Sequence, residues 1–192
     1  MKALILNGNP ESQDHLDKAA DLLAKELKNR GWAAQSFLLR DLDVTACRGC
    51  FKCWAETPGI CLMDDDGRAL TSALAQSDLM VFLTPVSFGG YGSLFKTAVE
   101  RAVLPLLLPF MTVREKETHH PLRYGRGISL FAVGELPARD FKSEEIFQNI
   151  VAANARNLDS PDRSCTFIYD DMSDDEIHGR MCLLAAEAGA KK

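Results

Sequence analysis

Short apolar runs alternate with amphipathic stretches along the 192-residue chain. The apolar runs are short and end near glycine, proline or polar residues, which predicts buried strands. They lie at Lys2–Leu6, Trp32–Leu39, Leu79–Thr84, Gly127–Val133 and Cys165–Tyr169. The amphipathic stretches carry apolar residues at helical spacing and predict helices. These cover His15–Arg30, Asp64–Gln76, Leu94–Leu104, Ser143–Asn157 and a final segment from the capping box Ser173–Glu176 to about Ala188.

Strands that alternate with helices indicate βαβ units, and right-handed crossovers then give a parallel sheet with helices on both faces. The pattern fits an α/β flavodoxin-like three-layer sandwich, with a five-stranded parallel sheet in the order 2-1-3-4-5. No linker or repeat divides the chain, so we expect one domain spanning residues 1–192. Ligands in such sheets lie beyond the carboxyl ends of the strands.

Composition narrows the class of protein. Lys plus Arg is 22 and Asp plus Glu is 27, a formal net charge of −5 without a basic cluster, so we expect no nucleic-acid partner. The longest apolar stretch, Ala102–Met111, is interrupted by prolines, so no membrane association is expected. Met1–Leu6 is too short for a signal peptide. A cytoplasmic location follows as an expectation, with the six cysteines present as thiols or ligands rather than disulfides.

Two loops after predicted strands are candidates for ligand binding. Asn7–Asp14 contains glycine and short polar residues whose backbone N–H groups can meet a phosphate. Its acidic side chains disfavour that interpretation, and the loop alone favours a simple turn capped by Ser12 or Asp14. Thr84–Ser93 carries three glycines that permit close approach of a ligand, with Phe88 and Tyr91 as candidates to pack beside a flat ring. The alternative for this second loop is a flexible connection.

Four of the six cysteines lie close together, in the pattern Cys47-x2-Cys50-x2-Cys53-x7-Cys61. This spacing suits thiolates that wrap around a cubane iron–sulfur cluster, whereas structural zinc sites usually use two separated Cys-x2-Cys pairs. Two alternatives remain open: free thiols that pack with Phe51 and Trp54 over the ligand site, or a disulfide or redox-active pair. The loop follows the second strand, so we expect it at the ligand edge of the sheet.

Other metal candidates are less favoured by the sequence. The adjacent residues His119 and His120 point in different directions and do not predict a metal site. Cys165 and Cys182 are expected in the core.

Taken together, the chain resembles the NAD(P)H-dependent FMN reductases of flavodoxin-like fold, which include the iron–sulfur flavoproteins. The residues that carry the resemblance are Leu4–Pro10, Cys47–Asp65, Thr84–Gly89, Lys96 and Glu100-Arg101. The resemblance covers about Met1–Leu104, and the remainder agrees only in the order of elements.

The resemblance implies FMN as cofactor and NAD(P)H as electron donor. It assigns the FMN phosphate to Asn9, Glu11 and Ser12, and the isoalloxazine ring to Pro85, Val86, Ser87, Phe88 and Gly89. Family members often read Gly-Ser-Pro-Arg in the first loop. This chain has Asn9 in place of the serine, Glu11 in place of the arginine and His15-Leu16 where small polar residues are usual.

The expected function is an FMN-dependent NAD(P)H oxidoreductase that passes electrons to a quinone, a flavin or a similar small acceptor, with no catalytic side chain assigned. One alternative is an iron–sulfur flavoprotein electron carrier with a 4Fe-4S cluster on Cys47, Cys50, Cys53 and Cys61. A second is a flavodoxin-fold binding or regulatory protein that has lost FMN. The resemblance also implies a homodimer or higher homo-oligomer, for which the apolar stretch Val103–Met111 is either an interface or the end of a core helix.

Overall fold

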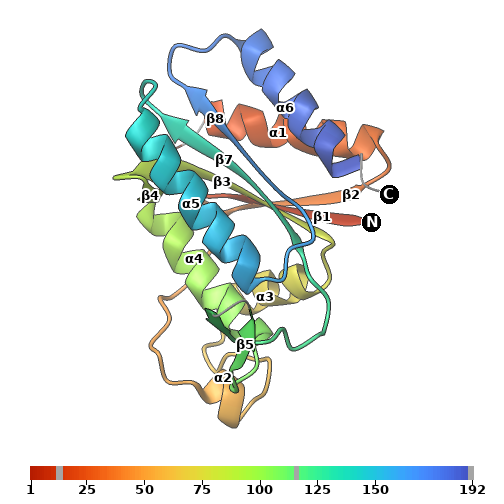
Figure 1. The fold of residues 1–192 in the computed structure, drawn as a ribbon, viewed down its shortest axis with the longest axis vertical. Coiled ribbons are helices and arrows are strands. Elements are labelled where there is room, and N and C mark those ends of the chain that lie inside the picture. The colour runs from red at the N-terminus through yellow and green to blue at the C-terminus, as the bar shows by residue number, and fades with distance from the viewer. Residues whose placement is uncertain (12–14, 115–116, 190–192) are drawn as a thin grey trace.

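The central sheet separates two layers of helices (Figure 1). The computed structural model describes residues 1–11, 15–114 and 117–189. Its parallel strands lie in the order β2-β1-β3-β7-β8, which are the five predicted strands in the predicted order 2-1-3-4-5. Helices α1 and α6 cover one face, and α3, α4 and α5 cover the other (Figure 1). The flavodoxin-like α/β sandwich expected from the sequence is confirmed.

The principal elements agree with the sequence pattern to within a few residues at most ends. The parallel strands are β1 (Lys2–Asn7), β2 (Ala33–Leu38), β3 (Leu79–Ser87), β7 (Ser129–Leu136) and β8 (Arg163–Tyr169). The long helices are α1 (His15–Asn29), α3 (Gly67–Ala75), α4 (Ser93–Val103), α5 (Phe141–Asn157) and α6 (Asp174–Gly189). The predicted capping box is present at the start of α6, where the Ser173 N–H donates to Glu176 Oε2 over 2.8 Å.

The burial of the central strands explains why their apolar runs could be recognised in the sequence. Strands β1, β3 and β7 occupy the middle of the sheet and are buried on both faces, so almost every side chain in them is apolar. The edge strand β2 is mostly exposed, with only Ala34 and Phe37 partly buried. Two apolar clusters, one on each face of the sheet, attach the helices to it.

Several short elements were not predicted. A strand β4 (Gly90–Tyr91) pairs antiparallel with the end of β3, and β5 (Thr112–Arg114) with β6 (Glu117–His119) forms a separate two-stranded sheet. A one-turn helix α2 (Lys52–Ala55) lies within the cysteine segment, and two 3-10 turns, η1 (Leu39–Asp41) and η2 (Leu104–Leu106), follow β2 and α4. These elements are too short for a hydrophobic period to reveal them.

Two helix starts differ from the prediction. The aspartates Asp64–Asp66 directly precede α3, with Asp66 at its N-cap and Asp65 Oδ1 accepting a hydrogen bond from the N–H of Gly67 over 3.0 Å. Asp66 also accepts a hydrogen bond from the N–H of Asp43 over 2.8 Å, and Asp65 one from the N–H of Thr45 over 3.2 Å. They therefore tie the two ends of the cysteine segment together. Helix α5 is capped by Asp140 rather than by Ser143, whose N–H and hydroxyl both donate to the Asp140 carboxylate.

Hydrogen bonds from Ser143, and then from Lys142, hold the pKa of Asp140 below its usual value, since they favour the charged carboxylate. None of the helices within the described ranges combines the length and the apolar character that a membrane span requires.

Candidate functional site

The loop after β1 is held by its own side chains. The Asn9 N–H donates to Asn7 Oδ1 over 3.0 Å, and Asn9 Oδ1 accepts from the N–H of Glu11 over 3.1 Å. Both asparagine amides also donate to Asp17 Oδ1, over 2.7 and 3.4 Å. Asn9 is fully buried, so its amide shapes the loop from inside, whereas Glu11 is exposed. Ser12 and Asp14 lie outside the described residues.

A cation that the sequence did not reveal stands beside this loop. Arg40, in η1, donates to both carboxylate oxygens of Asp17 over 2.9 and 2.8 Å, and to the carbonyl oxygen of Asn9 over 3.4 Å. Both side chains of the ion pair are mostly buried. The first loop, which lacks the arginine usual in relatives, therefore has a guanidinium supplied from the end of β2.

The segment expected to line the flavin ring is a tight β-hairpin. Strand β3 continues to Ser87, past the predicted end at Thr84, and β4 pairs back on it. The two residues of the turn, Phe88 and Gly89, both have positive φ, at 50° and 79°, which is the signature of a type I′ turn. The base is closed by the Gly92 N–H, which donates to Thr84 Oγ1 over 3.1 Å. The alternative of a flexible connection is therefore wrong.

The two aromatic side chains of the hairpin, Phe88 and Tyr91, lie in different environments. Phe88 stands at the tip and is 98% exposed, in a backbone conformation that is strained for a bulky residue. Tyr91 instead packs edge-on against Phe82, Phe95 and Phe147, and its hydroxyl accepts a 2.8 Å hydrogen bond from Asn154. Burial raises the pKa of Tyr91. Tyr91 therefore belongs to the core, and the expectation that it packs beside a flat ring is wrong.

The cysteine segment gathers its thiols around Cys53. Cys53 is buried, Cys61 is half-buried, and Cys47 and Cys50 are exposed. Burial raises the pKa of Cys53, and the charges of Cys61, Cys47 and Cys50 raise it further, so each of these three thiols lies within electrostatic reach of Cys53. None of the six cysteines, all of which belong to the described residues, is paired in a disulfide in this structure.

The backbone between the first three cysteines is tightly curved. Gly49 has φ of 65° and Phe51 has φ of 54°, so the chain passes twice through the left-handed region before α2 begins. A left-handed phenylalanine is rare and strained. The consequence is a compact turn with Cys47, Cys50 and Cys53 close to one another in the chain.

The cysteine segment packs at the end of α4 remote from the hairpin. The Trp54 indole donates to the carbonyl of Leu104 over 3.0 Å, and α2 contacts η2, which follows α4. The hairpin precedes α4 at Gly92, so the two candidate sites lie at opposite ends of this 11-residue helix, which is about 16 Å long. The expectation that the cysteine segment lies at the ligand edge therefore does not hold for α2. The loop begins at the ligand edge but carries α2 away from it.

The two adjacent histidines contact different parts of the fold. His120 packs against Trp54 in a tilted arrangement with ring centroids 4.9 Å apart, and its Nδ1 lies 2.9 Å from the carbonyl oxygen of Leu108. His119 Nδ1 lies 3.3 Å from Asn157 Oδ1 on α5. His120 thus helps to pack the cysteine segment, whereas His119 faces α5.

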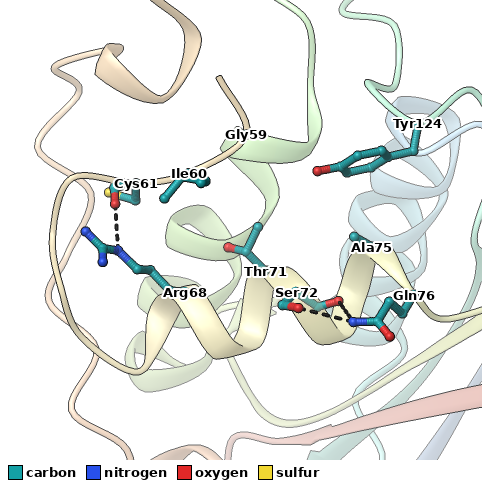
Figure 2. A pocket seen from close by; sticks show the side chains of 9 residues that line it. All are labelled: Gly59, Ile60, Cys61, Arg68, Thr71, Ser72, Ala75, Gln76 and Tyr124. Atoms are coloured by element: carbon teal, nitrogen blue, oxygen red, sulfur yellow. Dashed lines mark hydrogen bonds between the residues drawn. The ribbon is translucent and has the colours of Figure 1, made fainter. Parts of the chain in front are cut away.

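A cavity of about 720 Å³ adjoins the end of the cysteine segment (Figure 2). One wall is α3, with Thr71, Ser72, Ala75 and Gln76, and another is the stretch Gly59–Cys61. Figure 2 shows the Tyr124 ring over the cavity and Arg68 bound to the Cys61 carbonyl, a hydrogen bond of 2.8 Å. The cavity has the size of a small-molecule site and lies beside Cys61 rather than beside the hairpin.

Comparison with known proteins agrees with this geometry. The sequence model of the NADPH-dependent FMN reductases matches residues 1–126, which include the first loop, the cysteine segment and the hairpin. The chain belongs to this family.

Among similar sequences, an iron–sulfur flavoprotein of Archaeoglobus fulgidus is 29% identical over 102 residues, which cover 53% of this family member and 49% of the relative. A second iron–sulfur flavoprotein of the same organism is 27% identical over 135 residues, covering 69% and 55%. The chain thus spans about half the length of the curated relatives it matches.

Solved structures share the fold of this reductase-family chain at low identity. An NAD(P)H:quinone oxidoreductase from Methanothermobacter marburgensis has a TM-score of 0.68 at 12% identity and covers 100% of this chain and 98% of its own. An FMN-dependent NADH-azoreductase from Bacillus anthracis, solved with FMN, has a TM-score of 0.64 at 13% identity, covering 99% and 98%.

The reactivity of the cysteines tests their placement. In metal-free protein, iodoacetamide at pH 8 is expected to modify the exposed Cys47 and Cys50 first and Cys165 last. Burial raises the pKa of Cys165 to about 12, so very little of its reactive thiolate exists at pH 8. Peptide mass spectrometry after short exposures measures the order. Labelling of Cys165 as fast as Cys50 would contradict the structure.

Proposed function

We propose that this protein is an FMN-dependent NAD(P)H oxidoreductase formed by a single flavodoxin-like domain of residues 1–192, with its flavin site at the carboxyl edge of the sheet. The observation that carries the proposal is the family match, because it spans both loops that meet at this edge. FMN, when bound, supplies hydride and electron transfer between a nicotinamide nucleotide and a small acceptor such as a quinone or a flavin. No side chain is assigned as a catalytic acid or base.

The residues at the edge fit a flavin in two places. We assign Asn9, Glu11 and Ser12 to the phosphate end, as the family resemblance implies. There the buried Asn9 amide fixes the backbone, and Arg40, which is paired with Asp17, contacts the carbonyl oxygen of Asn9. Pro85, Val86, Ser87, Phe88 and Gly89 stand at the ring end, where the hairpin offers peptide groups that can bind the edge of a flat ring. The exposed Phe88 is positioned to cover such a ring or its substrate.

The experiment that tests this proposal is the absorption spectrum of protein purified without oxygen. Flavin bands in the visible range, lost when NADPH or NADH is added, are the expected result. A colourless protein that takes up no added FMN would contradict the proposal. It would favour the alternative of a flavodoxin-fold binding or regulatory protein that has lost its cofactor.

Arg40 gives a sharper test of the phosphate end. Arg40→Ala is expected to weaken FMN binding by about tenfold to a hundredfold, because a charge-assisted hydrogen bond contributes on the order of 1.5–3 kcal/mol and 1.4 kcal/mol corresponds to tenfold. Quenching of flavin fluorescence measures the dissociation constant. The matched control is Arg30→Ala, since Arg30 lies at the exposed end of α1. If the folded Arg40→Ala variant binds FMN as tightly as the wild-type protein does, Arg40 does not take part in FMN binding.

A second function is favoured by the cysteine segment: electron transfer through a 4Fe-4S cluster on Cys47, Cys50, Cys53 and Cys61. Three thiols within electrostatic reach of the buried Cys53, on a strained and compact backbone, fit the four sulfur donors that such clusters use. Two similar proteins are named iron–sulfur flavoproteins. Iron and acid-labile sulfide in anaerobically purified protein, at about four atoms each per chain, are the expected result for one cubane cluster.

The cavity beside Cys61 supplies this second candidate with a site for its acceptor. Its volume of about 720 Å³ suits a small molecule, and the half-buried Cys61 belongs to its wall. Electrons from a cluster at the four cysteines would then reach an acceptor without crossing the length of α4.

We also propose that the protein is a homo-oligomer. The predicted interface stretch Val103–Met111 is part buried and part exposed. Leu106 is buried, whereas Phe110 and Met111 are exposed, as is Val113 on β5. Large apolar side chains exposed side by side mark an interaction surface. A second copy of the chain is the occupant that the family resemblance supports.

Met111, which is 67% exposed, tests the oligomer. Met111→Glu is expected to shift the protein to monomer, because a carboxylate loses its hydration in an apolar interface. Light scattering during gel filtration measures the mass. Leu183→Glu, at another exposed apolar position on α6, is the control and should leave the mass unchanged. A monomeric wild-type protein would contradict the proposal.

A further inference from the structure

Three metal-binding side chains meet on the sheet face opposite the cysteine segment, between α1 and α6. Glu26 belongs to the last turns of α1, and His178 and Cys182 lie four residues apart on α6, so they occupy the same face of that helix. The two helices pack together through buried apolar residues, among them Leu27 and Met181. This packing fixes the backbone from which the three side chains project.

The donor atoms of the three residues already lie close together. One atom from each, a carboxylate oxygen, an imidazole nitrogen and the thiol sulfur, lies within 4.8 Å of the other two. His178 Nε2 and Glu26 Oε1 are 3.9 Å apart. Within residues 1–11, 15–114 and 117–189, this is the group of three or more histidine, cysteine, aspartate or glutamate residues whose donor atoms all lie within 4.8 Å of one another. Small side-chain rotations bring three donors at this spacing onto one ion.

The chemistry of the donors selects the ion. Magnesium and calcium prefer sites made wholly of oxygen, whereas a thiolate and an imidazole with one carboxylate suit zinc. Zinc takes four ligands in a tetrahedron, and a site with three protein ligands leaves one position for water. Glu26 and Cys182 are partly buried and His178 is half-exposed, so an ion can reach the group from solvent.

Glu26 has other neighbours with which an ion must compete. Asn29 Nδ2 donates to Glu26 Oε1 over 3.4 Å, and Arg30 Nη2 lies 3.9 Å from Glu26 Oε2. Both contacts are long and come from the exposed end of α1. They orient the carboxylate and leave it able to bind a cation from the side of His178.

We propose that Glu26, His178 and Cys182 form a zinc-binding site that links α1 to α6, distinct from the flavin edge and from the four-cysteine segment. On binding, the Cys182 thiol releases its proton to solvent and the sulfur forms the bond to zinc. A bound ion joins the two helices on the outside of their apolar interface. The site therefore stabilises the folded state without contacting the residues proposed for the redox function.

The test uses cobalt as a spectroscopic substitute for zinc, with the full chain in metal-free, reduced form. The four loop cysteines are themselves candidate thiolate ligands for cobalt, so the readout is the difference between wild-type protein and Cys182→Ser, which keeps all four. Wild-type protein is expected to bind one further equivalent, with a thiolate-to-cobalt absorption band that zinc removes. His178→Ala and Glu26→Gln should each weaken this binding by tenfold or more.

Asp21→Asn is the matched control, since Asp21 is an exposed carboxylate of α1 outside the group, and it should bind as wild-type does. Zinc is also expected to raise the unfolding temperature of wild-type protein more than that of Cys182→Ser. Equal cobalt stoichiometry in wild-type and Cys182→Ser would overturn the proposal. So would loss of the band in Cys182→Ser with full binding in both His178→Ala and Glu26→Gln, since the ion would then not be held by three side chains.

Discussion

Cys53→Ala is expected to abolish iron and sulfide binding while leaving the FMN content unchanged. Cys53 is the buried member of the four cysteines and the one whose pKa the other three raise, so it lies at the centre of the group. Without Cys53, a cubane cluster would be held by only three thiols, all of them exposed or half-buried, and would lack its one buried ligand. Iron and sulfide analysis, with the flavin absorption of the same sample, measures both cofactors.

The control for this prediction is Cys165→Ala, which removes a cysteine from β8, outside the segment, and should leave the iron content at the wild-type level. Because the cysteine segment and the hairpin lie at opposite ends of α4, loss of iron need not disturb the flavin. Iron that persists in Cys53→Ala would contradict the proposed cluster. Loss of both cofactors would instead indicate that the variant had failed to fold.

Arg101→Ala is expected to lower the free energy of unfolding by about 3–5 kcal/mol, the range found when one partner of a buried ion pair is removed. The Arg101 side chain is 1% exposed and that of Asp65 7%, and Arg101 Nη2 donates to Asp65 Oδ1 over 2.9 Å. Alanine leaves the Asp65 carboxylate buried without its cation. Urea unfolding followed by circular dichroism measures the change.

The same guanidinium also donates to the carbonyl of Met63 over 3.2 Å, so it fastens the end of the cysteine segment to α4. The matched control is Lys96→Ala on the same helix, whose ion pair with Glu100 is exposed and should change stability by at most about 1 kcal/mol. A loss below about 1 kcal/mol in Arg101→Ala would show that the buried pair contributes no net stability.

The arrangement of the sheet followed from the sequence because its causes are local. A strand buried on both faces needs an almost continuous apolar run, and a helix on a sheet needs an apolar stripe at helical spacing. Both patterns are complete within single segments such as Leu79–Thr84 and His15–Arg30. The handedness of the crossovers then leaves few orders for five parallel strands.

The cysteine group was predictable for the same reason, since Cys47, Cys50, Cys53 and Cys61 are neighbours in the chain. The location of these cysteines in the fold could not be predicted from the sequence. Whether the segment stays at the ligand edge or is carried along α4 depends on the contact of Trp54 with Leu104 and on the buried pair of Arg101 and Asp65, which join distant segments.

The remaining site residues depended on contacts between distant parts of the chain. Nothing in the sequence distinguishes Arg40 from a surface arginine, and only the position of η1 places it beside Asp17. Tyr91 packs against Phe82 because the hairpin reverses the direction of the chain. Glu26 lies near one end of the chain and the pair His178 and Cys182 near the other, and no spacing connects Glu26 to that pair. Residue pattern thus determined the strands, the helices and the cysteine cluster, because each is encoded within one segment. Folding determined which charges, aromatic rings and thiols meet, because those contacts depend on how whole elements pack.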